Sequence, residues 1–210
     1  MDQVKLIHPQ FVIEEPAQNA KIVLSSTSPA RKILLERLKL PFVVAAPDVD
    51  ETPLPNESAY RLVKRLAVAK ARINANNFVD ALIIGCDQVG VLKGRILTKP
   101  GTHAKAVEML MQASGQRVTF YTGLCLLNTK TDSLQLAVER FDVVYRTFTL
   151  SMVENYLQKD QPYQCAGAIK AESLGSALFE RIVGKDPSAL TGLPLIRLVR
   201  MLEQEGVRIV

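Results

Sequence analysis

The spacing of apolar and polar residues along the chain predicts short strands and amphipathic helices. Residues 21–25 have the pattern of a first strand, and a second strand pattern follows at residues 42–46. Between them the chain turns through Ser26 into a helix with Ser28 as its N-cap and Pro29 at its first position, where a missing N–H has no partner to lose. The buried face of this helix is expected to comprise Ile33, Leu34 and Leu38.

Residues 57–75 repeat apolar positions at helical spacing, which predicts a long helix. Its buried stripe is expected to comprise Leu62, Leu66, Ala69 and Ile73. Residues 81–86 are almost continuously apolar, as is typical of a central strand covered on both faces. Asp87 and Gln88 interrupt this run, so we expect the strand to end there.

The rest of the chain predicts further strands and helices, in an order that is not strictly alternating. The expected elements are a hairpin over residues 89–97, a helix over 102–114, two long strands around a turn at 128–133, a helix opened by a capping box at Ser151 and Glu154, and a last helix from Pro194 to Gly206. This order predicts an α/β fold with a mixed central sheet, flanking helices and two lobes, built by residues 21–210. Residues 1–20 lack a secretory signal pattern and are expected to form an N-terminal extension.

The composition fits a soluble protein with a substantial core. The 210 residues are 48% hydrophobic, and no apolar run approaches the roughly 20 residues that a membrane-spanning helix needs. The cysteines Cys86, Cys125 and Cys165 are far apart and form no C-x-x-C pair, which argues against a disulfide framework or a zinc site. Free cysteines fit a reducing compartment, so we expect a cytoplasmic protein.

The net charge of +5 is compatible with a nucleic-acid surface or with a pocket for a small polyanion. Acidic and basic residues are interspersed, without a long run of like charge, and the chain has no tryptophan for base stacking. The sequence therefore argues against nucleic-acid binding and leaves the small polyanion.

Two loops carry groups that suit a metal–phosphate ligand. Ser26, Ser28 and Arg31 lie where the first strand enters its helix, and hydroxyl, N–H and guanidinium donors at a helix N-terminus can hold a phosphate. The alternative there is an ordinary capped helix. Glu51 ends an acidic triplet with Asp48 and Asp50, whose oxygens suit a hard divalent cation. The alternative for this triplet is a solvated turn.

Three further residues are candidates for catalysis. Asp87 follows an apolar strand, where an unpaired carboxylate would be costly unless it binds a metal or a cation. Its alternative is a structural pair with a basic residue. Lys70 lies beside the buried stripe of the long helix, and snorkelling of its ammonium to solvent is the favoured interpretation for this lysine alone. Lys99 follows the hairpin and is anchored by Pro100. His8 and His103 have no evident partners, which argues against histidine catalysis.

Several ordered motifs together resemble the Maf family of nucleotide pyrophosphatases. They are LSSTSPAR at residues 24–31, DVDET at 48–52, RLAVAKA at 65–71, GCDQV at 85–89, TKP at 98–100, FYTG at 120–123, CAGAIKAE at 165–172 and LPL at 193–195. The resemblance spans residues 21 to 205. It implies a mixed α/β fold with a cleft between two lobes, often dimeric, and hydrolysis between the α- and β-phosphates of a nucleoside triphosphate with Mg²⁺, Mn²⁺ or Co²⁺.

The resemblance also implies a substrate preference within the family. The GCDQV motif is similar to the branch that acts on 7-methyl-GTP, whereas the dTTP/UTP branch has Ala-Asp-Thr at that place. Gln88 and Glu172 match positions associated with this preference. Ala30 departs from the pattern, since a larger side chain is usual there, and this departure leaves a dTTP, UTP or other nucleotide preference as the alternative.

The roles implied by the resemblance combine the candidates into one hypothesis. Asp87 activates water or holds the metal together with Glu51, while two lysines, Lys70 and Lys99, act on the phosphates. Ser26, Ser28, Ala30, Arg31, Gln88 and Glu172 would bind the substrate. A rival from another class is a non-catalytic nucleotide-binding regulator of septum formation, against which the set of carboxylates and lysines argues.

Overall fold

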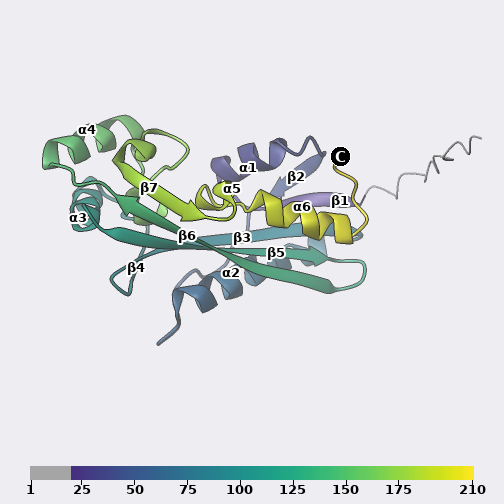
Figure 1. Ribbon diagram of the computed structural model, residues 1–210. Coiled ribbons are helices and arrows are strands. Elements are labelled where there is room, and N and C mark those ends of the chain that lie inside the picture. Colours follow the sequence, from purple (N-terminus) through teal and green to yellow (C-terminus); the bar gives the residue numbers. More distant parts are fainter. Residues whose placement is uncertain (1–19) are drawn as a thin grey trace, which may run out of the picture.

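The computed structural model describes residues 20–210, which fold around one seven-stranded mixed sheet (Figure 1). The strands are β1 (Lys21–Ser25), β2 (Phe42–Ala45), β3 (Ala81–Leu92), β4 (Arg95–Leu97), β5 (Arg117–Asn128), β6 (Ser133–Tyr145) and β7 (Phe179–Gly184). Their order is β2-β1-β3-β5-β6-β7, with β4 also paired to β3. β1 is parallel to β2 and β3, and the other pairs are antiparallel.

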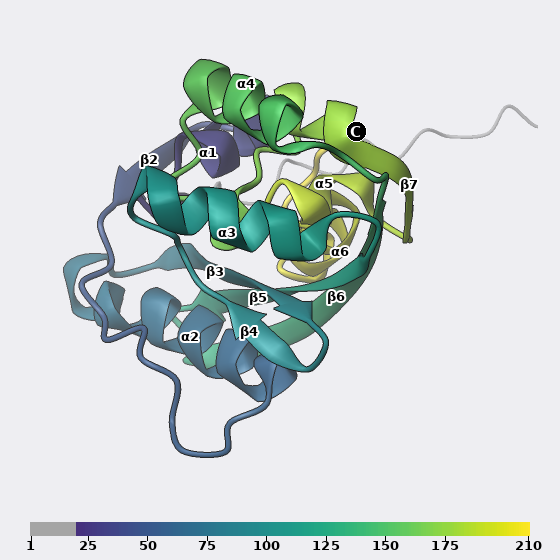
Figure 2. The same ribbon diagram turned by 90° about the vertical axis from the view of Figure 1, so that its left-hand side faces the viewer.

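Helices cover both faces of this sheet. They are α1 (Pro29–Glu36), α2 (Ala59–Ile73), α3 (His103–Ala113), α4 (Leu150–Asp160), α5 (Pro187–Leu190) and α6 (Leu195–Gln204), with short 3₁₀ turns η1 (Ala75–Asn77), η2 (Ala166–Ala168) and η3 (Leu174–Leu178). In Figures 1 and 2, α2 lies on one side of the long strands, and α1, α5 and α6 lie on the other. None of these helices is long and apolar enough to cross a bilayer.

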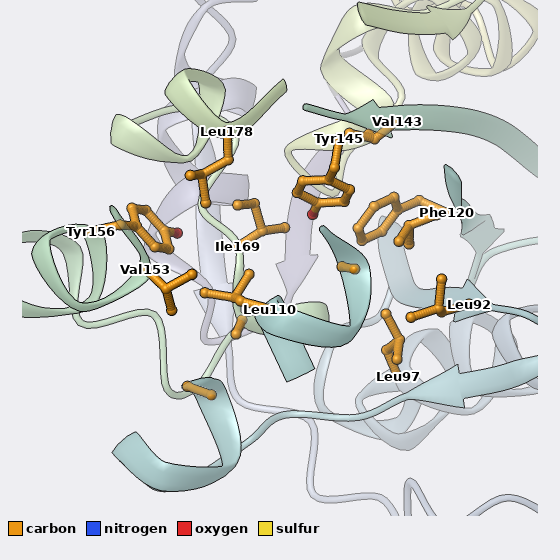
Figure 3. Packing of buried hydrophobic residues seen from close by; sticks show 14 of the residues in the cluster. Leu92, Leu97, Leu110, Phe120, Val143, Tyr145, Val153, Tyr156, Ile169 and Leu178 are labelled. Atoms are coloured by element: carbon orange, nitrogen blue, oxygen red, sulfur yellow. The ribbon is translucent and has the colours of Figure 1, made fainter. Parts of the chain in front are cut away.

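The core on the side opposite α2 is divided between the two ends of the long strands. One cluster packs α1 and α6 on β1 and includes Leu24, Leu35 and Leu198. The other lies under α3 and α4 (Figure 3) and includes Phe120, Tyr145 and other residues at the far ends of β5 and β6. The mixed central sheet with flanking helices is confirmed, and the division into two lobes stays a prediction.

Two glycines bring α2 unusually close to the sheet. A Cβ at Gly85 would lie 2.1 Å from the carbonyl oxygen of Ala67, and one at Gly123 would lie 2.3 Å from that of Val63. Both distances are shorter than any van der Waals contact, so only glycine permits this approach of helix and strands. The close approach determines which side of α2 is buried.

The buried side of α2 therefore differs from the predicted stripe. Leu62 and Leu66 are buried as expected, but Ala69 is only partly buried and Ile73 is 50% exposed. The sheet-facing residues also include Val63, Ala67, Lys70 and Ala71. The helix turns its small alanines toward the glycines because the larger Ile73 could not enter that narrow space.

The prediction for α1 was wrong at one residue. Ile33 is 57% exposed, whereas Leu34 and Leu35 are buried against β1 and α6. Leu38, which follows the helix, is partly buried against the same cluster. Helical spacing alone did not locate the centre of the buried face.

Most predicted helix ends and turns are confirmed. The Ser28 side chain caps α1, with Pro29 as its first residue, and Thr102 caps α3. The hairpin turns at Lys93 and Gly94, both with positive φ, as a two-residue turn of strands requires. The last helix follows Pro194 and ends before Gly206, whose φ is +80°.

Two boundaries were predicted wrongly. β3 continues without a break through Asp87 and Gln88, because both residues keep extended pairing with β5. The N-cap of α4 is Thr149, whose hydroxyl accepts from the N–H of Met152. Ser151 is therefore inside the helix, and the expected capping box is absent. The predicted N-terminal extension, residues 1–20, lies outside the described residues except for Ala20.

Candidate active site

The candidate site lies at a gap along one edge of β3. β1 pairs with β3 as far as Gly85, and β4 pairs with the same edge from Gly90 onward. Within the described chain, residues 86–89 have a strand partner only on the other edge, where β5 lies. Ser26 follows the end of β1, so the predicted phosphate-binding motif and the carboxylate motif meet at this gap.

Asp87 points from the gap toward α2 and forms a buried ion pair with Lys70. The Lys70 Nζ is 2.7 Å from the Asp87 Oδ1, and the two residues are 5% and 6% exposed. The snorkelling interpretation of Lys70 was wrong, because the close packing at Gly85 places this part of α2 against the sheet. The structural pair foreseen as an alternative for Asp87 is thus present, with Lys70 as its partner.

Glu51 extends this pair to the surface. One carboxylate oxygen lies 2.6 Å from the Lys70 Nζ, and the other lies 3.1 Å from the Nζ of Lys99. The side chain of Glu51 is 42% exposed. The result is a continuous chain of alternating charges, Asp87–Lys70–Glu51–Lys99, from the core to solvent.

An arginine holds the loop that carries Glu51. Arg65 of α2 binds both carboxylate oxygens of Glu57 at 2.8 Å and donates to the carbonyl oxygen of Thr52 at 3.0 Å. The hydrogen bonds from Arg65 outweigh desolvation and lower the pKa of Glu57 to about 2. This clamp fixes the residue next to Glu51 and orients the loop.

The environments of the two site carboxylates shift their pKa values in opposite directions. Burial raises the pKa of Asp87, and the nearby positive charge of Lys70 only partly opposes this effect. Partial burial also acts to raise the pKa of Glu51, but its hydrogen bonds and charge pairs with Lys70 and Lys99 prevail and lower it. Asp87 is thus the better proton acceptor of the two, and Glu51 remains charged more readily.

The predicted phosphate loop is built around the hydroxyl of Ser26. This buried oxygen accepts from the N–H of Ser28 at 3.2 Å and from the Nη1 of Arg31 at 3.3 Å. Arg31 also donates from its Nε to the carbonyl oxygen of Gly192 at 2.9 Å. The ordinary cap is present too, since the Ser28 hydroxyl accepts from the Arg31 N–H. One serine caps the helix, and the other orients the guanidinium.

A buried polar contact locks the end of β1 to α2. The Ser25 hydroxyl donates to the carbonyl oxygen of Lys70 and accepts from Asn74 at 2.8 Å. Asn74 also donates to the carbonyl oxygen of Ala46 at 3.3 Å. The sequence interpretation missed the positioning role of Asn74 and Arg65. Asn74 is the buried C-cap of α2 and Arg65 is a partly exposed residue of the helix, so no common sequence pattern marks the two.

Gln88 lies on the opposite face of β3 from Asp87, as strand alternation requires. Its amide nitrogen donates to the Thr122 hydroxyl at 3.0 Å and lies 2.8 Å and 3.0 Å from the carbonyl oxygens of Ala189 and Leu190. Thr122 in turn donates to Ala189 at 2.8 Å. The amide nitrogen therefore holds α5, and the side-chain oxygen is the group left for a ligand.

Other predicted residues do not converge on Asp87. Glu172 is exposed, and no ion pair or hydrogen bond within residues 20–210 joins it to Gln88. Ala30 is partly exposed in the first turn of α1. Of the acidic triplet, Glu51 reaches the site, whereas Asp50 accepts from the N–H of Thr52 and closes a turn, and Asp48 is exposed.

The histidine and cysteine expectations have mixed outcomes. His103 has partners after all: its ring nitrogens lie 3.0 Å from the Tyr163 hydroxyl and 2.8 Å from the carboxylate of Glu154. His8 lies outside the described residues. Cys86 and Cys125 are buried free thiols, and burial raises their pKa values to about 11 and about 12. Both are core residues, whereas Cys165 is only partly buried.

The donors at the site suit a metal that shares its ligands with a substrate. No group of three or more His, Cys, Asp or Glu side chains able to hold a metal occurs in the part of the chain described. Asp87 and Glu51 nevertheless place carboxylate oxygens within 2.7 Å of one atom, the Lys70 Nζ. Two carboxylates suit Mg²⁺, which commonly takes its remaining ligands from water and substrate phosphates.

Comparisons with known proteins identify relatives over almost the whole chain. Residues 21–205 match the family described as Maf-like protein. A 7-methyl-GTP pyrophosphatase of Nitrosococcus oceani is 54% identical over 185 residues, which cover 88% of this chain and 93% of that protein. A 7-methyl-GTP pyrophosphatase of Vibrio cholerae is 50% identical over 195 residues, which cover 92% of this chain and 100% of that protein.

A solved structure extends the comparison to the fold. The Ham1 protein of Staphylococcus aureus superimposes with a TM-score of 0.51 and covers 88% of this chain and 99% of its own. Only 12% of the residues are identical. The likeness is therefore one of architecture, and it agrees with the mixed α/β arrangement described above.

Proposed function

Because this chain belongs to the Maf-like protein family, we propose that it is a nucleoside-triphosphate pyrophosphatase. It hydrolyses the α–β phosphoanhydride to a nucleoside monophosphate and pyrophosphate, with 7-methyl-GTP as its substrate. The observation that carries this proposal is the buried Lys70 between Asp87 and Glu51. A cation between two carboxylates, beside a serine–arginine phosphate loop, suits attack of water on the α–β phosphoanhydride, with the nucleoside monophosphate and pyrophosphate as products.

The proposal includes a divalent cation, Mg²⁺, Mn²⁺ or Co²⁺. Asp87 and Glu51 would hold it with the substrate phosphates, once those phosphates take over the ammonium of Lys70. When bound, the cation would neutralise charge on the phosphates and favour ionisation of water. The two carboxylates would thus bind the Lys70 ammonium in the free protein and the metal in the complex with substrate.

Each side chain then has a separate task. Asp87 accepts the proton of the attacking water, a task that suits a carboxylate at the gap in β3. Lys70 and Lys99 neutralise negative charge on the phosphates, and Glu51 keeps both lysines oriented until substrate arrives. Ser26, Ser28 and Arg31 position the phosphates at the start of α1.

Base recognition falls to the other face of β3. The side-chain oxygen of Gln88 can accept a hydrogen bond from the N–H groups of guanine, because its amide nitrogen is already bound to α5. Glu172 would add a negative charge that favours the cationic methylated ring, and Ala30 would leave room beside it. Glu172→Ala should then lower the preference for 7-methyl-GTP over GTP. An unchanged ratio of kcat/KM values would remove Glu172 from this role.

One experiment tests the proposed function directly. Pyrophosphate and monophosphate release would be measured with 7-methyl-GTP, GTP, dTTP and UTP, each with Mg²⁺, Mn²⁺, Co²⁺ or excess chelator. We expect the highest kcat/KM with 7-methyl-GTP and loss of release with chelator. Preference for dTTP or UTP would overturn the substrate assignment, and no release from any nucleotide would favour a non-catalytic regulator.

Three broader features belong to the same proposal. The protein works in the cytoplasm as a homodimer, and its catalytic unit begins at residue 21, after the N-terminal extension. The free, buried thiols of Cys86 and Cys125 support a reducing compartment. Light scattering coupled to size-exclusion chromatography would measure the mass, and a monomeric mass at micromolar concentration would contradict the dimer.

A further inference from the structure

Asp186 is a buried carboxylate that is bound entirely by neutral donors. It is 3% exposed, and no ion pair joins it to another described residue. One oxygen accepts from the N–H and the hydroxyl of Ser188, at 3.1 Å and 2.5 Å. The other accepts from the N–H of Ile196 at 2.8 Å. The Ser188 hydroxyl also accepts from the N–H of Leu195 at 2.7 Å.

These contacts fix the turn between α5 and α6. Asp186 is the N-cap of α5, and through Ile196 it also satisfies an N–H in the first turn of α6. The N–H groups of Ser188 and Ile196, at the starts of the two helices, donate to its two oxygens and satisfy the buried carboxylate. The connecting residues 191–194 are held at both ends by one carboxylate.

The end of α5 and the residues that follow it direct their backbone carbonyl groups at two side chains that we propose bind the nucleotide. Ala189 and Leu190 accept from the amide of Gln88, and Gly192 accepts from the guanidinium of Arg31. Gly192 has a φ of +104°, and a Cβ there would lie 3.2 Å from the Arg31 Nε. Both side chains are therefore oriented by backbone that Asp186 holds in place.

We propose that Asp186 is a positioning residue for nucleotide binding, which acts through the carbonyl groups of residues 189–192 on Gln88 and Arg31. It touches neither the substrate nor the reacting atoms. This inference rests on the pyrophosphatase function proposed above. According to this inference, Asp186 affects the KM from the α5 side of the sheet. The carboxylates near α2 determine kcat.

The test is Asp186→Asn in the full chain, with 7-methyl-GTP and Mg²⁺. Asparagine keeps one acceptor oxygen, but its NH₂ group then faces a backbone N–H, so the turn loses one or two hydrogen bonds. We therefore expect KM to rise about tenfold, while kcat stays within about twofold of the wild-type value. The Kd of a non-hydrolysable α,β-methylene analogue should rise equally. Asp142→Asn is the matched control, because Asp142 binds Thr119 and Arg140 on the outer part of the sheet.

Coupling separates positioning from general stability. In a Gln88→Ala background, Asp186→Asn should raise KM by only about threefold. The effect that Asp186 exerts through Gln88 is already lost in this background, and only its effect through Arg31 remains. If Asp186→Asn does not fold, Ser188→Ala weakens the same turn and should raise KM about threefold. Unchanged KM with a lower melting temperature or lower kcat would overturn the inference. Absence of pyrophosphate release by the wild-type protein would instead overturn the proposed function.

Discussion

Asp87 and Gln88 are neighbours in one strand, yet they belong to two different kinds of environment. On the α2 face, Asp87 meets charged partners, with Lys70 and Glu51 in one buried-to-exposed chain. On the opposite face, Gln88 meets a hydroxyl and two backbone carbonyl groups of α5. The alternation of a β-strand separates these environments by the thickness of the sheet.

We infer from this difference that the two faces of β3 contribute to different steps, catalysis on the α2 face and base recognition on the α5 face. Charged groups that can exchange partners suit proton transfer and phosphate neutralisation, whereas fixed neutral hydrogen bonds suit recognition of a base. Both environments border the gap at residues 86–89, where neither β1 nor β4 pairs with β3. Changes on the α2 face should therefore act on kcat, and changes on the α5 face should act on KM and selectivity.

The largest effect is expected from Asp87→Asn. Loss of the proton acceptor should reduce kcat by roughly 10²-fold or more, while KM changes little. Fold integrity would be checked by the melting temperature, which should stay near that of wild type because Lys70 keeps Glu51 as a partner. Near wild-type turnover in this variant would exclude Asp87 as the base and would end the proposed separation of the two faces.

Lys70→Met tests the charge chain of the α2 face without touching the α5 face. Removal of one partner leaves the buried Asp87 carboxylate uncompensated, which should cost about 3 kcal/mol and lower the melting temperature by roughly 10 °C. Mn²⁺ should restore part of this loss, because a metal can then neutralise both carboxylates. Lys159→Met, at an exposed site of α4, is the control. An unchanged melting temperature would show that Lys70 does not compensate Asp87.

Much of this comparison could be anticipated from the sequence. The family resemblance, the mixed α/β fold and the capping at Ser28 and Thr102 are confirmed. The structure also brings together Asp87, Lys70, Glu51 and Lys99, although their catalytic roles remain predictions. Local patterns sufficed here because caps, turns and apolar runs are determined over a few residues.

The errors arose where distant segments decide the outcome. Gly85 and Gly123 set the rotation of α2, and neither glycine is part of the helix. Pairing with β5 carried β3 through Asp87, against the polar interruption in its sequence. Asp186 and Pro187 have the same cap pattern as Ser28 and Pro29, but the contact of Asp186 with Ile196 of α6 depends on how the two helices pack.

A change of intermediate size is expected from Gln88→Ala on the α5 face. The variant loses the acceptor proposed for the base and also releases α5, so KM for 7-methyl-GTP should rise about tenfold while kcat remains within a few-fold of wild type. The kcat/KM ratio of 7-methyl-GTP to UTP should fall as well. Measured kcat would decide: a fall as large as that of Asp87→Asn would mean that the two faces do not act separately.

The smallest effect concerns the clamp that holds the Glu51 loop to α2. Because the folded pKa of Glu57 is about 2, below its ordinary value of 4.5, its stabilisation is complete above about pH 4.5 and is lost as the pH falls through 2. Glu57→Gln should lower the stability at pH 7 by no more than about 1 kcal/mol, since the pair with Arg65 is partly solvated. Melting temperatures of wild type and variant should differ at pH 7 and converge near pH 2. Glu108→Gln, at an exposed site of α3, should show no such convergence. A constant difference between wild type and Glu57→Gln across this range would mean that the clamp acts by shape alone and not by the charge of Glu57.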